Sequence, residues 1–245
     1  MTFSGPGGTI GFAHRGARAE CRDNTLASFT RALTLGARAL ETDVWLSADG
    51  IVVLDHDGAF RVGLRRYPIR SLARRALPGH VPSLVDLYMQ CGTDFELSID
   101  IKDDDAAAPL LDVARQAGAA SRLWLCSPHL ASLRAWRELN RDAKLVHSTT
   151  LYQLTGLHHP HRDSSAESVA ATLHAHARHL DACDVAAVNL HHQAWNPSTV
   201  AAVHDHGVGA FAWDAQTAET LTRLVGMGID AVYSDNVALM LGILS

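Results

Sequence analysis

Short β-rich runs alternate with alanine- and leucine-rich stretches of helical period along the whole 245-residue chain. This alternation is typical of repeated βα units around a parallel sheet. The β-rich runs predict strands over residues 9–13, 39–45, 51–55, 95–101, 123–126, 144–147, 187–190, 209–213 and 231–234. Helical spacing predicts helices between them, among others over residues 130–140, 166–179, 197–206 and 218–227.

The turn signal Asp49-Gly50 sets one of these predicted strands apart. It leaves no room for a crossover helix, so the run over residues 51–55 must return as the second arm of a hairpin. Eight parallel strands remain, and eight is the number that closes a barrel whose interior side chains can just fill. The sequence therefore predicts one (β/α)8 TIM barrel domain over residues 1–245, with residues 58–79 as a small insertion over the barrel mouth.

The first predicted helix has clear signals at both ends. Asp23 or Asn24 is the expected N-cap, and Leu26 and Phe29 follow on one face. Gly36 is expected to end the helix, because glycine readily adopts the left-handed conformation beyond a C-cap.

Composition restricts the class of protein. Hydrophobic residues make up 47% of the chain and charged residues 19%, which is enough apolar material for one large core. No apolar run reaches the roughly 18 residues that span a bilayer, and residues 1–8 lack the features of a signal peptide. Four scattered cysteines without C-x-x-C spacing favour reduced thiols. The reduced thiols and the lack of export features favour the cytoplasm. The net charge of −5 gives no general attraction for nucleic acid or an anionic membrane, so we expect no nucleic-acid partner and no stable membrane insertion.

Carboxylates gather on two of the predicted strands. Glu41 and Asp43 lie two residues apart and so share one face, and Asp100 has the same inward orientation on a later strand. Three converging carboxylates form an oxygen-only site that suits one divalent metal ion, Mg²⁺ or Ca²⁺. The alternative is a buried ion network in which inward arginine or lysine side chains pair with these carboxylates.

Two histidines and two cationic side chains are expected near these carboxylates. His14 and Arg15 follow the first strand directly, at the rim where barrel enzymes carry their active sites, and His56 ends the hairpin arm. The histidines are candidates for the general acid and general base, and Arg15 and Lys102 for neutralising phosphoryl oxygens. Trp213 ends another strand, where an aromatic wall for a substrate competes with ordinary packing.

Six arginines crowd the predicted insertion: Arg61, Arg65, Arg66, Arg70, Arg74 and Arg75. A solvated basic face is the simpler interpretation of such a cluster. Its expected position over the barrel mouth makes recognition of a second anionic group the alternative.

A resemblance to a known family rests on an ordered series of motifs. They are His14-Arg15-Gly16, Asp23-Asn24-Thr25, Glu41-Thr42-Asp43-Val44, Asp49-Gly50, His56-Asp57, Asp100-Ile101-Lys102, Phe211-Ala212-Trp213 and the run from Gly228 to Asp235. This series resembles the glycerophosphodiester phosphodiesterase family over nearly the whole chain. The resemblance implies hydrolysis of glycerophosphodiesters to glycerol 3-phosphate and an alcohol, with a divalent metal.

Carried over residue by residue, the resemblance assigns each candidate a role. His14 and His56 become the acid/base pair, Arg15 and Lys102 the phosphate clamps, and Glu41 and Asp43 two of the metal ligands. Asp100 stands where the family typically has glutamate, one methylene longer, which leaves the choice between Mg²⁺ and Ca²⁺ open.

Two other functions compete with hydrolysis of small phosphodiester substrates. A lysophospholipase D-like enzyme of the same architecture would act on lipids, and would require an apolar mouth or a membrane anchor. A catalytically silent glycerophosphodiester-binding protein would have lost a histidine or a metal carboxylate, whereas this sequence retains them all. The headgroup of the substrate and the oligomeric state stay open at this point.

Overall fold

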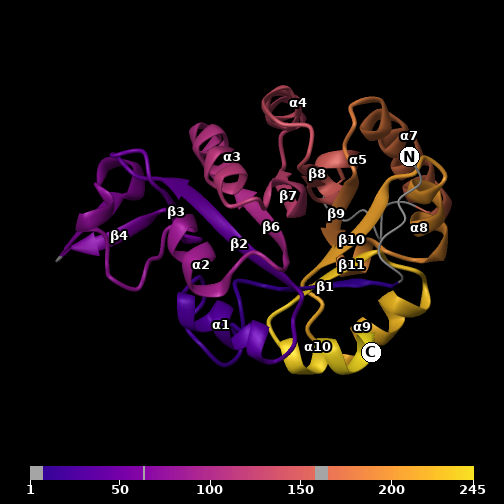
Figure 1. Ribbon diagram of the computed structural model, residues 1–245. Helices are drawn as coiled ribbons and strands as arrows, with labels where there is room; N and C mark the ends of the chain where they lie inside the picture. The colour runs from indigo at the N-terminus through magenta and orange to yellow at the C-terminus, as the bar shows by residue number, and fades with distance from the viewer. Residues whose placement is uncertain (1–7, 63, 158–164) are drawn as a thin grey trace.

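Parallel strands joined by helices form a closed barrel in the computed structural model, which describes residues 8–62, 64–157 and 165–245 (Figure 1). The eight parallel strands of this part of the chain are β1 (Ile10–Ala13), β2 (Ala39–Leu46), β6 (Glu96–Ile101), β7 (Leu123–Ser127), β8 (Lys144–Ser148), β9 (Ala187–His191), β10 (Gly209–Trp213) and β11 (Ala231–Ser234). Each pairs with its neighbours in the order β1-β11-β10-β9-β8-β7-β6-β2, and β2 pairs with β1 to close the ring. The predicted (β/α)8 barrel is confirmed.

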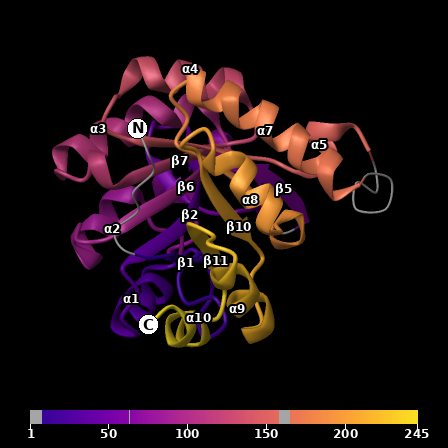
Figure 2. The ribbon, with the colours of Figure 1, turned by 90° about the vertical axis from the view of Figure 1, so that its right-hand side faces the viewer.

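Helices cover the outside of this barrel (Figure 2). They are α1 (Leu26–Thr34), α2 (Leu84–Cys91), α3 (Ala107–Gln116), α4 (Leu130–Leu139), α5 (Leu151–Thr155), α7 (Ala166–Ala182), α8 (Pro197–His204), α9 (Ala218–Gly226) and α10 (Val237–Leu244). The four helices predicted over 130–140, 166–179, 197–206 and 218–227 are present, with ends that differ by one to three residues. Among the described residues, none of the helices has both the length and the apolar character that crossing a bilayer requires.

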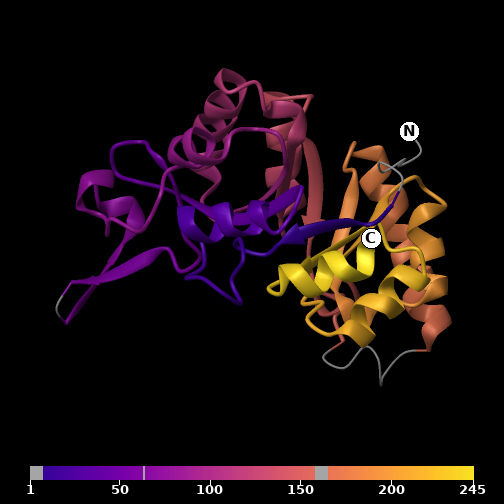
Figure 3. The same ribbon diagram turned by 60° about the horizontal axis from the view of Figure 1, so that its bottom comes forward.

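Strand β3 (Val52–Leu54) is the hairpin arm that the Asp49-Gly50 turn predicted. It runs antiparallel to β2, with Val44 opposite Leu54 and Leu46 opposite Val52. The chain then forms a second hairpin, β4 (Ala59–Val62) and β5 (Arg65–Pro68), and two short 3-10 turns, η1 (Ile69–Ser71) and η2 (Arg74–Ala76). This insertion extends away from the barrel wall (Figure 3).

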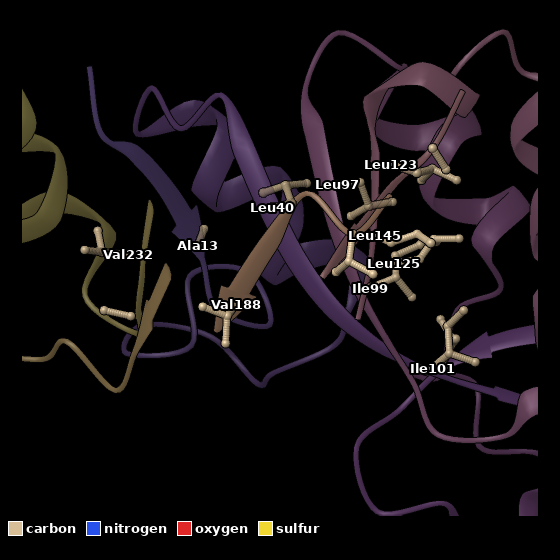
Figure 4. Packing of buried hydrophobic residues seen from close by; sticks show 14 of the residues in the cluster. Ala13, Leu40, Leu97, Ile99, Ile101, Leu123, Leu125, Leu145, Val188 and Val232 are labelled. Carbon is tan, nitrogen blue, oxygen red and sulfur yellow. The ribbon is translucent and has the colours of Figure 1, made fainter. Parts of the chain in front are cut away.

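Two apolar layers stabilise the barrel. The outer layer fills the space between strands and helices and includes Leu40, Leu97 and Ile99 (Figure 4). The inner layer fills the barrel interior, where Phe12 stacks on Tyr233 with ring centroids 4.9 Å apart. Complete burial of such a side chain contributes about 1.5–3 kcal/mol, so the two layers together hold the strand ends in fixed positions.

The first helix begins one residue later than predicted. Thr25 is the N-cap, and its hydroxyl accepts a hydrogen bond from the backbone N–H of Ser28, so the assignment of the cap to Asp23 or Asn24 is wrong. Asn24 instead has a left-handed backbone with φ of 50°, and its side chain is directed at strand β2. Gly36 follows the C-cap with φ of 101°, as the helix stop predicts.

Candidate active site

The predicted site residues meet in one cavity of about 320 Å³ at the carboxyl ends of the strands. The residues that line it include His14, Arg15, Glu41, Asp43, His56, Asp100, Lys102 and Trp213. All eight side chains singled out from the sequence therefore lie around the same space.

The register between β2 and β6 brings the three carboxylates together. Asp43 lies opposite Asp100, and Glu41 lies opposite Ser98. Because these strands are parallel, side chains at paired positions point to the same face of the sheet. Glu41 and Asp43 are only 6% and 2% exposed, so their charges are almost fully removed from water.

Cationic side chains contact two of these carboxylates. Lys102 Nζ lies 3.0 Å from Asp43 Oδ1 and 2.7 Å from Asp100 Oδ2. Arg15 Nε lies 3.1 Å from the other Asp43 oxygen, an ion pair without hydrogen-bond alignment. Burial lowers the pKa of Lys102, but Asp100 and Asp43 outweigh burial and raise it above its ordinary value. The ion network considered as an alternative therefore exists around Asp43 and Asp100.

Glu41 is less well compensated. Its Oε2 accepts a hydrogen bond of 2.9 Å from the backbone N–H of Arg15, and His14 Nε2 lies 3.8 Å away. Burial raises the pKa of Glu41 to about 7, with further contributions from Asp43 and Asp100. Burial also raises the pKa of Asp100, although Lys102 opposes this effect. Burial therefore disfavours the ionised form of Glu41 and of Asp100, and their neighbouring cations do not fully offset this effect.

No group of three or more histidine, cysteine, aspartate or glutamate side chains is arranged to hold a metal ion within residues 8–62, 64–157 and 165–245. The three carboxylates are nevertheless oxygen ligands of the kind that Mg²⁺ and Ca²⁺ prefer. The raised pKa values of Glu41 and Asp100 arise from burial and mutual repulsion, which a bound cation would relieve. The donor set therefore fits a hard divalent cation in its chemistry.

His14 is held by a carboxylate from the far end of the chain. Its Nδ1 lies 2.6 Å from Asp235 Oδ1, and Asp235 follows strand β11. Burial lowers the pKa of His14, but Glu41 and Asp235 outweigh burial and raise it above 6.5. Burial raises the pKa of Asp235, but the hydrogen bond from His14 outweighs this and lowers it. The pair therefore favours a protonated imidazole and an ionised carboxylate.

His56 lies in the loop after β3, in a more open environment. Its Nδ1 lies 2.9 Å from Asp57 Oδ1, and the hydrogen bond from His56 lowers the pKa of Asp57. Asp55 Oδ1 accepts hydrogen bonds of 2.9 Å from the backbone N–H groups of Asp57 and Gly58, which fixes the loop. The side chain of His56 is 43% exposed, compared with 24% for His14.

Polar groups also line the inner part of the cavity. Ser98 Oγ lies 3.0 Å from the hydroxyl of Tyr233 and 3.3 Å from Cys126 Sγ. Trp213 borders the cavity from β10, and its ring makes an edge contact with His191 at 4.7 Å between centroids. A second cavity, of about 460 Å³, shares Asp100, Lys102 and Ser148 with the first.

Sequence reasoning gave no site role to two residues that position the predicted ones. Asn24 Nδ2 lies 3.3 Å from Asp43 Oδ2, and Asn24 Oδ1 accepts a hydrogen bond of 2.7 Å from the Thr42 hydroxyl. Asp235 orients His14 as described above. Both lie within motifs of the resemblance, and Asp235 directly follows a predicted strand, which is a signal that could have identified it.

A cavity at the carboxyl ends of barrel strands is where enzymes of this fold act. Here the cavity is lined by basic side chains and by two histidines, an arrangement suited to binding an anionic phosphoester and to proton transfer. The chain matches the model of the glycerophosphoryl diester phosphodiesterase family over residues 14–73 and 89–239. It therefore belongs to that family and is an enzyme of the phosphodiesterase class.

Related sequences and solved structures of the same fold match this chain over nearly their full lengths. The glycerophosphodiester phosphodiesterase of Caldanaerobacter subterraneus subsp. tengcongensis is 26% identical over 251 residues, 93% of this chain and 94% of the relative. The crystal structure of a glycerophosphodiester phosphodiesterase from Thermotoga maritima has a TM-score of 0.75 at 22% identity and covers 96% of this chain and 98% of that one. An Oleispira antarctica phosphodiesterase, solved in complex with the product sn-glycerol-3-phosphate, has a TM-score of 0.77 at 20% identity and covers 96% of both chains.

Proposed function

We propose that this chain hydrolyses glycerophosphodiesters to glycerol 3-phosphate and an alcohol, by histidine acid/base catalysis and with one divalent metal ion, Mg²⁺ or Ca²⁺. The observation that carries the proposal is that His14, His56 and Lys102 border a single cavity together with three carboxylates. The Oleispira antarctica relative was solved with the same product that this reaction would release.

Arg15 and Lys102 bind the phosphate in this proposal. Both are cations at the edge of the cavity, and both are fixed by contacts to Asp43. A positioned cation loses little conformational freedom when it meets a phosphoryl oxygen, and it stabilises the charge that develops there. Trp213 offers an apolar wall for the glycerol carbons, and the adjoining cavity has room for the alcohol half of the substrate.

His14 and His56 divide the two proton transfers. One removes a proton from the nucleophile, and the other donates a proton to the departing alcohol oxygen. Each imidazole is oriented through Nδ1 by a carboxylate, Asp235 for His14 and Asp57 for His56, which leaves Nε2 for the substrate. An oriented imidazole of this kind transfers protons efficiently near neutral pH.

Glu41, Asp43 and Asp100 would hold the metal ion. When bound, the cation would neutralise charge on the phosphate that Arg15 and Lys102 also contact. Asn24 supports this role for Asp43, because its amide holds one of the carboxylate oxygens in place. Asp100 is one methylene shorter than glutamate, and this length is the feature expected to set the choice between Mg²⁺ and Ca²⁺.

A cytoplasmic location is part of the same proposal. The four cysteines are all unpaired, and reduced thiols are usual in that compartment.

The experiment is a panel of glycerophosphodiesters that differ in the alcohol. Each is incubated with the purified chain and Mg²⁺, Ca²⁺ or Mn²⁺, and glycerol 3-phosphate release is measured. Release that depends on the metal and stops on chelation supports the proposal. Binding of the substrates without release would instead support a silent binding protein.

A further inference from the structure

The β4–β5 hairpin brings arginines into direct opposition. Its register places Arg61 opposite Arg66 and Val62 opposite Arg65. Like charges directly opposite each other destabilise a pair of strands. The positive charge of the hairpin therefore does not stabilise the pairing of its two strands. It is also a local feature, because the whole chain has a net charge of −5.

The described part of the chain supplies no carboxylate partner for most of this charge. Arg74 lies 3.5 Å from Asp86, but no ion pair with a described residue is formed by the exposed side chains of Arg61, Arg65, Arg66, Arg70 and Arg75. Arg66 Nη2 donates a hydrogen bond to the backbone carbonyl of Asp57. Arg66 and Arg75 also act on the carboxylates of Asp57 and Asp49, but without an ion pair. Most of the charge of this cluster is thus available to an external anion.

An apolar side chain lies beside these arginines near the tip of the hairpin. Leu64 is 99% exposed, and Arg65 follows it directly. By contrast, the base of the insertion is firmly packed, because Ile69 and Leu77 are buried against Val53 and Val81. A fixed base with an exposed leucine and arginines beyond it is suited to contact with a surface that is both anionic and apolar.

We propose that the β4–β5 hairpin docks the enzyme on the surface of an anionic lipid bilayer. Arg61, Arg65 and Arg66 would lie at the level of the headgroups, and Leu64 would enter the boundary with the acyl chains. A nucleic acid would also attract the arginines, but its phosphate backbone gives an exposed leucine nothing to bury against. The leucine is what favours the bilayer.

Docking by this hairpin would bring the catalytic mouth close to the membrane. Arg61 and His56 line the same small cavity of about 190 Å³. Arg70 lines the cavity that adjoins the active site and shares Lys102 with it. The docking proposal does not depend on the reaction itself, because attachment and turnover are measured separately.

The test is cosedimentation of the full chain with phosphatidylcholine vesicles that contain or lack phosphatidylglycerol. The wild type should bind the anionic vesicles only, and less tightly as salt is raised. Each arginine near such a surface is worth about a factor of five, so the double variant Arg65→Glu, Arg66→Glu should bind at least about 25-fold more weakly. Leu64→Asn should weaken binding several-fold and leave the dependence on salt unchanged.

The matched control is Arg38→Glu, Arg178→Glu, which makes the same charge change at two exposed arginines elsewhere. It should bind vesicles like the wild type. In vesicle-free buffer, the variants Arg65→Glu and Leu64→Asn should release glycerol 3-phosphate from a soluble substrate at the wild-type rate. The double variant Arg65→Glu, Arg66→Glu should unfold at the wild-type temperature, so that lost binding is not lost folding. The proposal would be overturned if the wild type bound neutral and anionic vesicles equally, or bound neither. It would also be overturned if the control variant lost as much vesicle binding as the hairpin variants. The proposal would also be wrong if a DNA duplex bound tightly, competed with the vesicles, and bound the Leu64→Asn variant as tightly as the wild type.

Discussion

His14 and Asp235 join the first and last strands of the barrel through one hydrogen bond of 2.6 Å. His14 follows β1 and Asp235 follows β11, so the contact exists only when the barrel is closed. Closure of the fold and orientation of a proposed catalytic histidine are therefore coupled in one interaction.

Replacing Asp235 should change the pH dependence of catalysis. Because Asp235 helps to raise the pKa of His14, Asp235→Asn should move the limb of the kcat/KM profile that belongs to His14 to lower pH. The control is Asp230→Asn, which removes a similar carboxylate 2.7 Å from His204 without touching the cavity. Identical profiles for the wild type and Asp235→Asn would show that His14 does not titrate in the reaction.

Removing a proposed metal carboxylate should abolish turnover. Glu41→Ala and Asp43→Ala should lose both bound metal and activity, and a chelator should inactivate the wild type in the same way. The comparison is Glu96→Ala, because Glu96 lies on β6 outside the cavity and pairs with Lys144. Metal content and glycerol 3-phosphate release are measured for each. Full activity in the presence of a chelator at saturating substrate would refute the metal assignment.

The length of Asp100 should determine metal preference. Asp100→Glu adds one methylene and keeps the carboxylate, so it should keep activity and change the order of rates with Mg²⁺, Ca²⁺ and Mn²⁺. Asp100→Asn should reduce both metal affinity, measured by calorimetry, and rate. If the asparagine variant behaves like the wild type, Asp100 is not a ligand.

A second pair of histidines should make folding stability depend on pH. His147 Nδ1 lies 2.9 Å from His176 Nε2, and burial, together with His147 and His179, lowers the pKa of His176 to about 4. In the unfolded chain the imidazole of His176 takes up a proton near pH 6.5, whereas in the folded chain it does so only near pH 4. The free energy of unfolding therefore decreases as pH falls between those two values. The urea midpoint should fall less in this window for His176→Gln than for the wild type. His174→Gln, an exposed change on the same helix, should behave like the wild type.

The strand pattern was sufficient to predict the barrel and the face shared by Glu41 and Asp43. A period of two residues places both side chains inward wherever that strand lies. The predicted closure makes the first and last strands neighbours, so a position for Asp235 near His14 follows from it. The hydrogen bond between the two side chains could not be predicted in this way, because it depends on side-chain torsions. The left-handed backbone of Asn24 was not predicted either, because asparagine is a common N-cap residue and a cap at this position was the simpler interpretation.

The contacts of Lys102 illustrate a different limit. The sequence predicts that Lys102 points inward, and it also leaves two partners possible, a substrate phosphate or the buried carboxylates. In the structure the ammonium lies between Asp43 and Asp100. Side-chain torsions decide between such partners, and strand periodicity carries no information about them.

The most direct test of the account compares His14→Ala and His56→Ala on two substrates, one with an alkyl and one with an aryl leaving group. Each variant should lose about 10² to 10⁴ in kcat on the alkyl substrate, because a general acid or base contributes about that much. Metal content should stay near the wild-type value. An aryl oxide of low pKa needs no proton, so the aryl substrate should rescue the variant that lacks the acid and not the one that lacks the base. Near wild-type rates for both variants on the alkyl substrate would contradict the account.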